Sequence, residues 1–288
     1  MNSERTMDIA EAQARLEAKQ KQNESMKSLS VSSPEPSQET YCDTCGEVNG
    51  MNIALLGMKK FQHRECRCRR EVRELQEETD RIRLEGIRAE NRDRLVRDTT
   101  NAILAATPPM YQGIALDAKL KPWLDAFTGE QWLALKGGPG CGKTTQAWTL
   151  ARSIAERGHL LRPADNVTGW SARDCAAWNV PDWLAQVRRA FDTDEPPDLE
   201  TPWWLILDDL GSERVKKDSD GDSWAREQLY RVVNKRWEWK RPTIITTNLD
   251  GAEIAEKYDD RRIPDRIYDT RLTTVITLTG DSWRRKPR

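Results

Sequence analysis

One motif restricts the fold of this chain more than any other feature, the glycine-rich loop Gly-Gly-Pro-Gly-Cys-Gly-Lys-Thr at 137–144. It lies between an apolar run at 132–135 and a helical pattern at 145–155. In that context, successive backbone N–H groups cradle phosphates, the lysine contacts phosphate oxygens and the threonine hydroxyl binds Mg²⁺. A chance glycine turn lacks these flanking elements. We therefore predict binding of ATP with Mg²⁺ by Gly138, Pro139, Gly140, Cys141, Gly142, Lys143, Thr144 and Thr145.

The composition argues against a membrane protein. Of the 288 residues 32% are charged, the net charge is −1, and no apolar run approaches the ~20 residues of a membrane span. The polar N-terminus lacks the apolar core of a secretory signal. We expect a cytoplasmic protein with reduced cysteines, built from one ordinary domain and a smaller module. The near-neutral charge argues neither for nor against nucleic acid as a partner.

The N-terminal residues 1–40 are polar and end in a serine- and proline-rich stretch at 30–37. Such a composition cannot bury a core, so we expect a flexible arm, with a weak helix over 8–22.

Two close pairs of cysteines follow the arm. Four thiolates in this arrangement suit tetrahedral zinc, and the glycine after the first pair allows a tight turn whose N–H groups face the sulfurs. The second pair has one intervening residue in place of the commoner two, so His63 as a substitute for one of its cysteines stays open. Such a module docks on a protein or on nucleic acid. We expect a zinc-binding module over 41–70, with the ligands Cys42, Cys45, Cys66 and Cys68.

Residues 71–107 form a strongly charged segment with apolar or small side chains at near-heptad spacing. We expect a long amphipathic helix, and both a pairing coiled coil and a solvated helical linker remain open. The pair Pro108 and Pro109 ends this helix and marks the start of the main domain, which we place at 110–288. The seam residues are Val72, Leu75, Thr79, Ile82, Gly86 and Ala89.

Strand and helix patterns alternate after the glycine-rich loop, which predicts an α/β fold with a parallel central sheet. We expect a strand near 167–170, a helix over 181–191 and a buried strand at 203–207 that runs directly into Asp208 and Asp209. Carboxylates at this end of a strand lie where ligands bind in such sheets. Asp208 would position Mg²⁺, and Asp209 would orient or deprotonate the attacking water.

The next helix, expected over 224–239, leads to a buried strand that ends in Asn248. An amide at this edge can bind the γ-phosphate or the attacking water, and capping of the helix that begins near 250 is the alternative. Downstream arginines are suited to stabilise the charge that develops during phosphoryl transfer. They are Arg262, Arg266 and Arg284.

The order of these motifs resembles the additional-strand (AAA+) class of P-loop ATPases, and within it the DnaC/DnaI family of helicase loaders with its phage-borne members. The resemblance covers about residues 110–288, and the cysteine-rich module with its helical linker resembles DnaI in layout. Four segments carry it: Gly-Gly-Pro-Gly-Cys-Gly-Lys-Thr, Leu-Ile-Leu-Asp-Asp-Leu-Gly, Thr-Thr-Asn-Leu, and Ile-Pro-Asp-Arg-Ile followed by Gly-Asp-Ser-Trp-Arg.

The resemblance implies roles for individual residues. Lys143 and Thr144 correspond to Walker A, Asp208 and Asp209 to Walker B, Asn248 to sensor 1, Arg266 to the arginine finger with Arg262 as the alternative, and Arg284 to sensor 2. Many AAA+ proteins have Glu where this chain has Asp209. Because Asp is one methylene shorter, the resemblance implies slow hydrolysis, which suits a switch.

The function implied by the resemblance is ATP-dependent loading of a DnaB-type replicative helicase onto single-stranded DNA. The N-terminal module would bind the helicase, and the ATPase domain would self-associate into an open ring or spiral with nucleotide between subunits. Candidate DNA contacts follow the Walker B strand, although a solvated loop is the better explanation of them. These candidates are Arg214, Lys216 and Lys217.

Two other functions remain open from the sequence. An IstB-like ATPase that assists a transposase shares the ATPase half but usually lacks the cysteine module. A nucleotide-binding adaptor with little hydrolysis is favoured by Asp209. The twelve tryptophans invite a base-stacking interpretation, but most occupy apolar positions, so we expect core packing.

Overall fold

A computed structural model of the chain describes residues 14, 15, 17, 18, 21, 40–55, 58–63, 65–190, 197–213 and 221–280. The chain divides into two compact units, unit 1 with residues 1–90 and unit 2 with residues 91–288. Among the helices in the described ranges, none has the combined length and apolar character that crossing a membrane requires.

Unit 1 contains a small antiparallel sheet and the first part of a long helix. The strands β1 (Thr40–Tyr41), β2 (Val48–Leu55) and β3 (Met58–His63) pair in that order. The helix α2 (Arg67–Ala106) begins within the segment expected to bind zinc and contains nearly all of the expected linker at 71–107. The helical prediction for the linker is therefore confirmed over its whole length up to Ala106.

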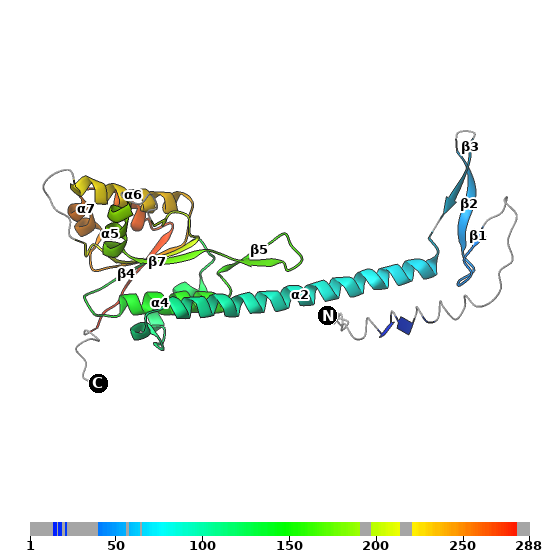
Figure 1. Ribbon diagram of the computed structural model, residues 1–288, viewed down its shortest axis with the longest axis horizontal. Helices are drawn as coiled ribbons and strands as arrows, with labels where there is room; N and C mark the ends of the chain where they lie inside the picture. Colours follow the sequence, from blue (N-terminus) through cyan, green and yellow to red (C-terminus); the bar gives the residue numbers. More distant parts are fainter. Residues whose placement is uncertain are drawn as a thin grey trace. The chain divides into compact units, whose positions relative to one another are not determined.

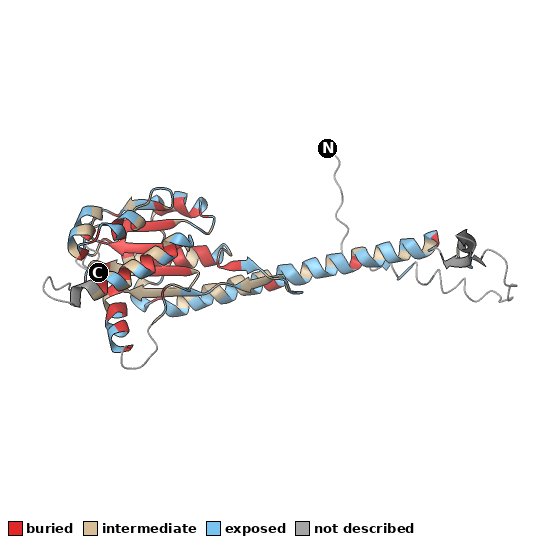
Figure 2. Ribbon diagram, turned by 90° about the horizontal axis from the view of Figure 1, so that it is seen from above, coloured by how far each residue is buried: buried red, intermediate tan, exposed pale blue. Residues whose placement is uncertain are grey.

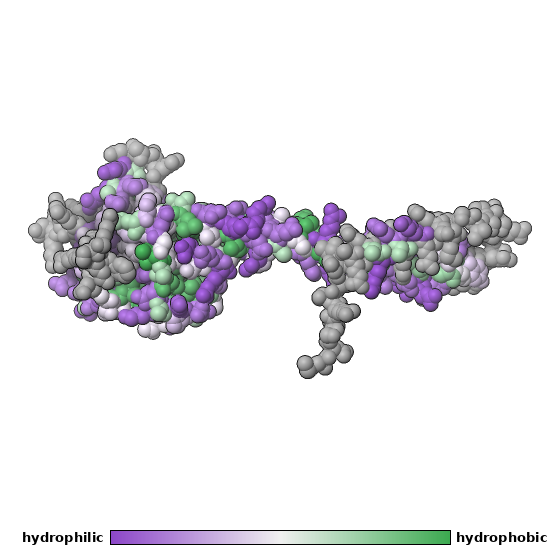
Figure 3. Space-filling model, turned by 90° about the horizontal axis from the view of Figure 1, so that it is seen from below, coloured by the Kyte–Doolittle hydropathy of each residue, from purple (hydrophilic) through white to green (hydrophobic). Residues whose placement is uncertain are grey.

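The part of α2 that belongs to unit 1 is amphipathic. Thr79 is buried, Val72, Leu75 and Ile82 are half-buried, and most of their neighbours are exposed. Figure 2 shows this part of α2 mainly in the exposed colour, and Figure 3 shows hydrophilic side chains over most of it. The seam expected from the near-heptad spacing is present from Val72 to Gly86 but not at Ala89, which is exposed, and pairing of two such helices stays a prediction.

Unit 2 is built on a parallel five-stranded sheet. Its order is β10-β4-β9-β8-β7, and every neighbouring pair is parallel. Strand β9 lies between β4, which leads into the glycine-rich loop, and β8, which carries the two aspartates. This inserted strand defines the additional-strand topology of P-loop ATPases, so the predicted fold class is confirmed. The strands are β4 (Trp132–Lys136), β7 (Cys175–Asn179), β8 (Trp204–Leu210), β9 (Thr243–Thr247) and β10 (Thr273–Thr277).

Helices cover both faces of this sheet (Figure 1). Alternate residues of a strand point to opposite faces, and accordingly Leu205 and Leu207 pack on one side while Trp204 and Ile206 pack on the other. One face packs against α5 (Val180–Ala190), α6 (Gly221–Glu238), α7 (Gly251–Tyr258) and α8 (Arg262–Ile267). The other packs against α3 (Lys121–Asp125) and α4 (Lys143–Glu156). Trp132, Trp183 and Trp204 are fully buried, as the core-packing interpretation requires.

The second part of α2 belongs to unit 2. The Asn91 side-chain amide donates to the carbonyl oxygens of Thr168 and Trp170 at 3.1 and 3.3 Å. The Arg92 guanidinium lies 5.5 Å from the centre of the Trp170 ring. These contacts join α2 to a hairpin formed by β5 (Leu161–Pro163) and β6 (Trp170–Ala172). Two short 3-10 helices, η1 (Pro109–Tyr111) and η2 (Ala118–Leu120), follow α2.

The strand expected near 167–170 is displaced, because only Trp170 lies in a strand, β6, which pairs with β5 outside the central sheet. Residues 167 and 168 lie in a turn, because the Gly169 N–H donates both to the backbone carbonyl and to the side-chain oxygen of Asn166. The strand that joins the central sheet is β7, which contains two small alanines and therefore lacks the usual signal of large β-branched residues.

Candidate nucleotide site and metal centre

A cavity of about 590 Å³ opens at the carboxyl edge of the sheet in unit 2. Because the strands are parallel, the loop after β4 and the ends of β7, β8 and β9 converge there. The lining residues are Met110, Tyr111, Pro139, Gly140, Gly142, Lys143, Thr144, Thr145, Asn179, Asp208, Asp209, Ser212 and Asn248. Most of the predicted nucleotide-binding residues are among them.

The glycine-rich loop is held in a conformation that needs glycine. A Cβ on Gly137 would lie 2.3 Å from the carbonyl oxygen of Leu278 and 2.7 Å from the Cys141 Sγ. Gly142 has a φ of 96° and precedes the first residue of α4, Lys143. The loop thus places the N-terminus of α4 at the cavity, where its free N–H groups and dipole attract anions.

Lys143 joins the glycine-rich loop to the end of β9. Its Nζ donates to the carbonyl oxygens of Gly137 and Gly138 at 2.8 and 3.0 Å, and to Asn248 Oδ1 at 2.6 Å. The side chain is almost buried but reaches the cavity. Two residues 105 positions apart, selected from sequence for phosphate contact, therefore lie in direct contact.

Asp208 contacts Thr144, which ends the glycine-rich loop at the start of α4. The Thr144 hydroxyl donates to Asp208 Oδ1 at 2.8 Å, and the Thr246 hydroxyl donates to the same oxygen at 2.6 Å. Burial raises the pKa of Asp208 above its ordinary value, while the hydrogen bonds from Thr246 and Thr144 act in the opposite direction. A hydroxyl and a carboxylate are the hard oxygen donors that Mg²⁺ prefers, so this pair fits that ion.

Asp209 occupies a bulge in its strand. The ladder between β8 and β9 shifts register between Leu207 and Leu210, and Asp209 has a φ of 60°. Its N–H donates to Thr246 Oγ1 at 2.8 Å in place of a ladder carbonyl. The bulge presents both Asp208 and Asp209 to the cavity, although neighbouring residues of a regular strand face opposite sides.

Thr246 is therefore a residue that the sequence reasoning missed, since it was noted only as part of a motif. Replacing Thr246 by Val keeps the shape of the side chain but leaves the part-buried Asp209 N–H without its acceptor. We expect the free energy of unfolding to fall by about 1 kcal/mol, the low end of the cost of an unsatisfied hydrogen-bonding group. ATP hydrolysis should fall as well, and Thr246→Ser should restore both. Denaturant unfolding and phosphate release measure the two effects, and equal values for wild type and Thr246→Val would contradict the role given to this hydroxyl.

Asn179 was also missed. It ends β7 directly opposite Asp208 in the strand register, and it lines the cavity. A single polar residue at the end of a strand of small side chains carries little signal in the sequence. Met110 and Tyr111 of η1 also line the cavity and offer it an apolar surface, and Met110 is 71% exposed.

The arginines of α8 lie away from the cavity, since neither Arg262 nor Arg266 is among its described lining residues. The Arg266 guanidinium pairs with Asp265 at 2.5 Å and lies 4.5 Å from the centre of the Trp237 ring. The Arg262 guanidinium pairs with the buried Asp260 at 2.7 Å. Arg284, Arg214, Lys216 and Lys217 lie outside the described residues.

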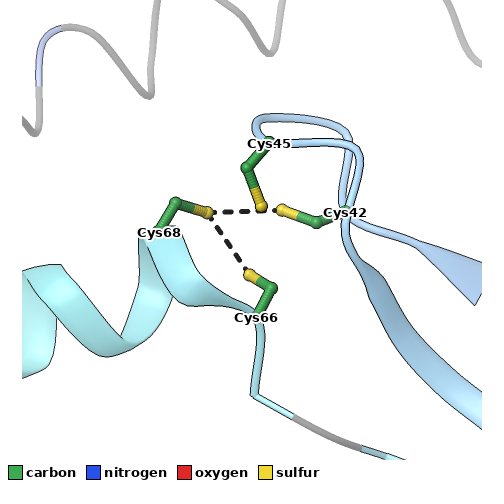
Figure 4. A group of neighbouring side chains, drawn as sticks. All are labelled: Cys42, Cys45, Cys66 and Cys68. Carbon is green, nitrogen blue, oxygen red and sulfur yellow. Dashed lines mark hydrogen bonds between the residues drawn. The ribbon is translucent and has the colours of Figure 1, made fainter.

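The four cysteines of unit 1 lie together at the start of α2 (Figure 4). Their sulfur atoms all lie within 4.8 Å of one another, and Cys68 Sγ is 3.4 Å from Cys42 Sγ and 3.3 Å from Cys66 Sγ. Tetrahedral zinc with ~2.3 Å bonds to sulfur requires sulfur separations of about 3.8 Å. The donor set and its spacing therefore fit Zn²⁺. The His63 side chain lies outside the described residues.

Backbone groups support the first cysteine pair. Gly46, with a φ of 68°, donates its N–H to the Cys42 carbonyl at 2.8 Å. Burial opposes ionisation of Cys42, yet hydrogen bonds from the N–H groups of Cys45 and Thr44 help to lower its pKa to about 6. The turn thus favours the thiolate, which is the form that binds metal.

No family model matches the sequence, and no curated protein matches it. Among solved structures, the chain is similar to the DnaC helicase loader, with 19% identity and a TM-score of 0.45 over 59% of this chain and 96% of that one. It is similar to DnaI with 20% identity and a TM-score of 0.42, over 60% and 88% of the two chains. AMPPCP-bound DnaA from Aquifex aeolicus gives 12% identity and a TM-score of 0.43, over 60% and 51%.

Proposed function

We propose that this protein is an ATP-dependent loader that places a DnaB-type replicative helicase on single-stranded DNA. The observation that carries the proposal is the convergence of Lys143, Thr144, Asp208 and Asn248 on one cavity. This geometry supports nucleotide binding, and the motif order, which resembles that of DnaC and DnaI, supports the loader function.

The residues divide the chemistry among them. The N–H groups of the glycine-rich loop and Lys143 would hold the phosphates, and Thr144 and Asp208 would hold Mg²⁺, which neutralises phosphate charge when bound. Asp209 and Asn248 line the same cavity and would orient the attacking water. Asp209 is short for a general base, so we expect slow hydrolysis.

Arg266 would complete the site of a neighbouring subunit. It lies on α8, outside the described lining of its own chain's cavity, and its half-buried guanidinium contacts Asp265, Trp237 and Asn234, so reaching a neighbouring nucleotide would require these contacts to be exchanged. We predict that Arg266→Ala binds ATP normally and loses hydrolysis and assembly, because a finger acts on the developing charge of γ-phosphoryl transfer.

Mixing two inactive variants tests whether Arg266 of one subunit acts on the nucleotide bound by its neighbour. Lys143→Ala cannot bind nucleotide but retains its finger, and Arg266→Ala retains its nucleotide site. A mixture should recover hydrolysis at interfaces where the first variant supplies Arg266 to the second. Arg271→Ala is the matched control, since Arg271 is an exposed, ion-paired arginine just beyond α8.

An inactive mixture, or equal nucleotide affinity in Lys143→Ala and Arg266→Ala, would contradict the assignment of Arg266 as the arginine finger. If Arg266→Ala keeps hydrolysis while Arg262→Ala alone loses it and recovers it in the mixture with Lys143→Ala, Arg262 is the finger.

Loading itself can be measured on circular single-stranded DNA, because a closed helicase ring cannot thread onto a circle. The assay follows displacement of an annealed oligonucleotide by a DnaB-type helicase with Mg-ATP. We expect displacement to require this chain and to fail with Lys143→Ala. Displacement that does not depend on the chain, or binding of duplex DNA in preference to single strands, would contradict the loader function.

A further inference from the structure

A buried carboxylate follows the Walker B strand and is not used by the chemistry described so far. Glu213 is 8% exposed and lies three residues beyond the end of β8. Its Oε2 accepts the N–H of Gly211 at 3.1 Å, and its Oε1 accepts the hydroxyl of Tyr258. A buried carboxylate that is satisfied in this way fixes the groups around it, because losing a partner would leave a charge unpaired.

Tyr258 is the last residue of α7 and is 2% exposed. Burial and the negative charge of Glu213 raise its pKa well above the ordinary value, so the hydroxyl stays protonated and acts as a donor. The neighbouring Lys257 adds a second connection, because its Nζ donates to the Glu213 carbonyl at 2.8 Å. Two residues of α7 thus hold one residue of the turn.

The held turn is the one that contains Asp209. Asp209 accepts the N–H of Ser212 at 3.2 Å and the Ser212 hydroxyl at 2.9 Å through its backbone carbonyl. Gly211 has a φ of 89°, and a Cβ there would lie 2.5 Å from Leu249 Cδ1, so the turn also packs closely on the segment that leads into α7. Loss of the Glu213 side chain would therefore free the backbone at Gly211 and Ser212, and the position of Asp209 would change with it.

Helix α7 is itself fixed to the other side of the cavity. It begins three residues after Asn248, with a capping box formed by Asp250 and Glu253. The Leu249 N–H donates to Thr247 Oγ1 at 3.0 Å, and the Thr247 hydroxyl donates to the Leu210 carbonyl at 2.8 Å. The end of β9 and the turn after β8 are thus both held in place next to α7.

We propose that the Glu213–Tyr258 pair is a positioning device that holds the turn after β8 so that Asp209 faces the nucleotide. The pair thereby sets the rate of hydrolysis and contributes nothing to nucleotide affinity. Neither residue belongs to the described lining of the cavity, so both act through the backbone of the turn. This inference rests on the proposed ATPase function.

The test compares Tyr258→Phe, Glu213→Ala and the double variant in the full chain. We expect each single variant to lower kcat for ATP hydrolysis by about tenfold with KM and nucleotide Kd unchanged, the effect of misplacing a reacting group through one lost hydrogen bond. The double variant should be no slower than the slower single variant, because both remove the same unit. Hydrogen exchange at the Gly211 amide should become faster in each.

Tyr268→Phe is the matched control. Its hydroxyl donates to the Leu249 carbonyl at 3.1 Å, a hydrogen bond in the same region that involves neither Glu213 nor the backbone of 209–213, so kcat should stay at the wild-type value. Effects of the Tyr258 and Glu213 variants that multiply, a loss that appears in KM, or an unchanged kcat would overturn the positioning role alone. A wild-type chain that binds ATP and never hydrolyses it would overturn the proposed function, and this inference with it.

Discussion

Lys143→Ala should abolish nucleotide binding at physiological concentrations. The ammonium group belongs to a residue that lines the cavity, and the Asn248 oxygen and the loop carbonyls hold it in place. Hydrogen bonds to charged groups contribute about 1.5–3 kcal/mol each, and two contacts to phosphate oxygens therefore correspond to a loss of about 100-fold or more. Equilibrium binding of a fluorescent ATP analogue in the presence of Mg²⁺ measures the loss.

Lys136→Ala is the control for this experiment. Lys136 ends β4, near the same loop, and pairs with Asp250 at 3.6 Å, but it is not among the described residues that line the cavity. Its replacement should change the affinity by less than about twofold, because exposed ion pairs contribute little. Comparable losses in the two variants would mean that Lys143 does not contact the phosphates.

Removal of zinc should unfold the cysteine module and leave unit 2 intact. The module consists of a small sheet and the first turn of α2, and in so small a structure four metal–thiolate bonds supply most of the stability. Structural zinc contributes about 10–16 kcal/mol of apparent binding free energy at neutral pH. We expect one zinc ion per chain by elemental analysis, lost in Cys42→Ser, with faster hydrogen exchange over 41–47 and 65–70.

Cys175→Ser provides the comparison. Cys175 is an exposed cysteine of unit 2, apart from the cluster, so this variant should keep its zinc and its exchange pattern. Nucleotide binding should be unchanged in both cysteine variants. A chain that contains no zinc when purified from zinc-supplemented cells, or that retains it in Cys42→Ser, would contradict the four-cysteine site.

The grouping of the candidate nucleotide-binding residues around one cavity was predictable, because these residues belong to motifs with a fixed mechanism. The glycine-rich loop defines the strand before it and the helix after it, and the aspartates and Asn248 each follow a buried apolar strand. A parallel sheet then brings those ends together without any further information. The contact between Lys143 and Asn248 follows from this rule.

The missed features depend on tertiary contacts. The strand β10 is an edge strand with partly exposed threonines, so its pattern is weak, and β7 contains small residues that give no strand signal. From the sequence, Arg236 is expected to be a charged residue on the exposed face of a helix, yet it is fully buried. Its guanidinium donates to the carbonyls of Leu199, Pro202, Trp203 and Pro242.

Glu213 and Tyr258 illustrate the same limit. Each is an ordinary residue in the sequence, 45 positions apart, and only the packing of α7 against the turn brings them together. The bulge at Asp209 has a similar origin, since the Thr246 hydroxyl takes the place of a ladder carbonyl. The spacing of residues along the chain cannot reveal that a side-chain hydroxyl accepts a hydrogen bond that a backbone carbonyl would accept in a regular sheet.

The most direct test of the loader function is affinity capture from host lysate in Mg-ATP, with the full chain and with its Cys42→Ser variant as baits and mass spectrometry as the readout. We predict that the full chain captures the replicative helicase and that the variant, whose zinc module is lost, does not. Capture of a transposase in place of the helicase would contradict the loader function. Equal capture of the helicase by both baits would contradict the role given to the N-terminal module.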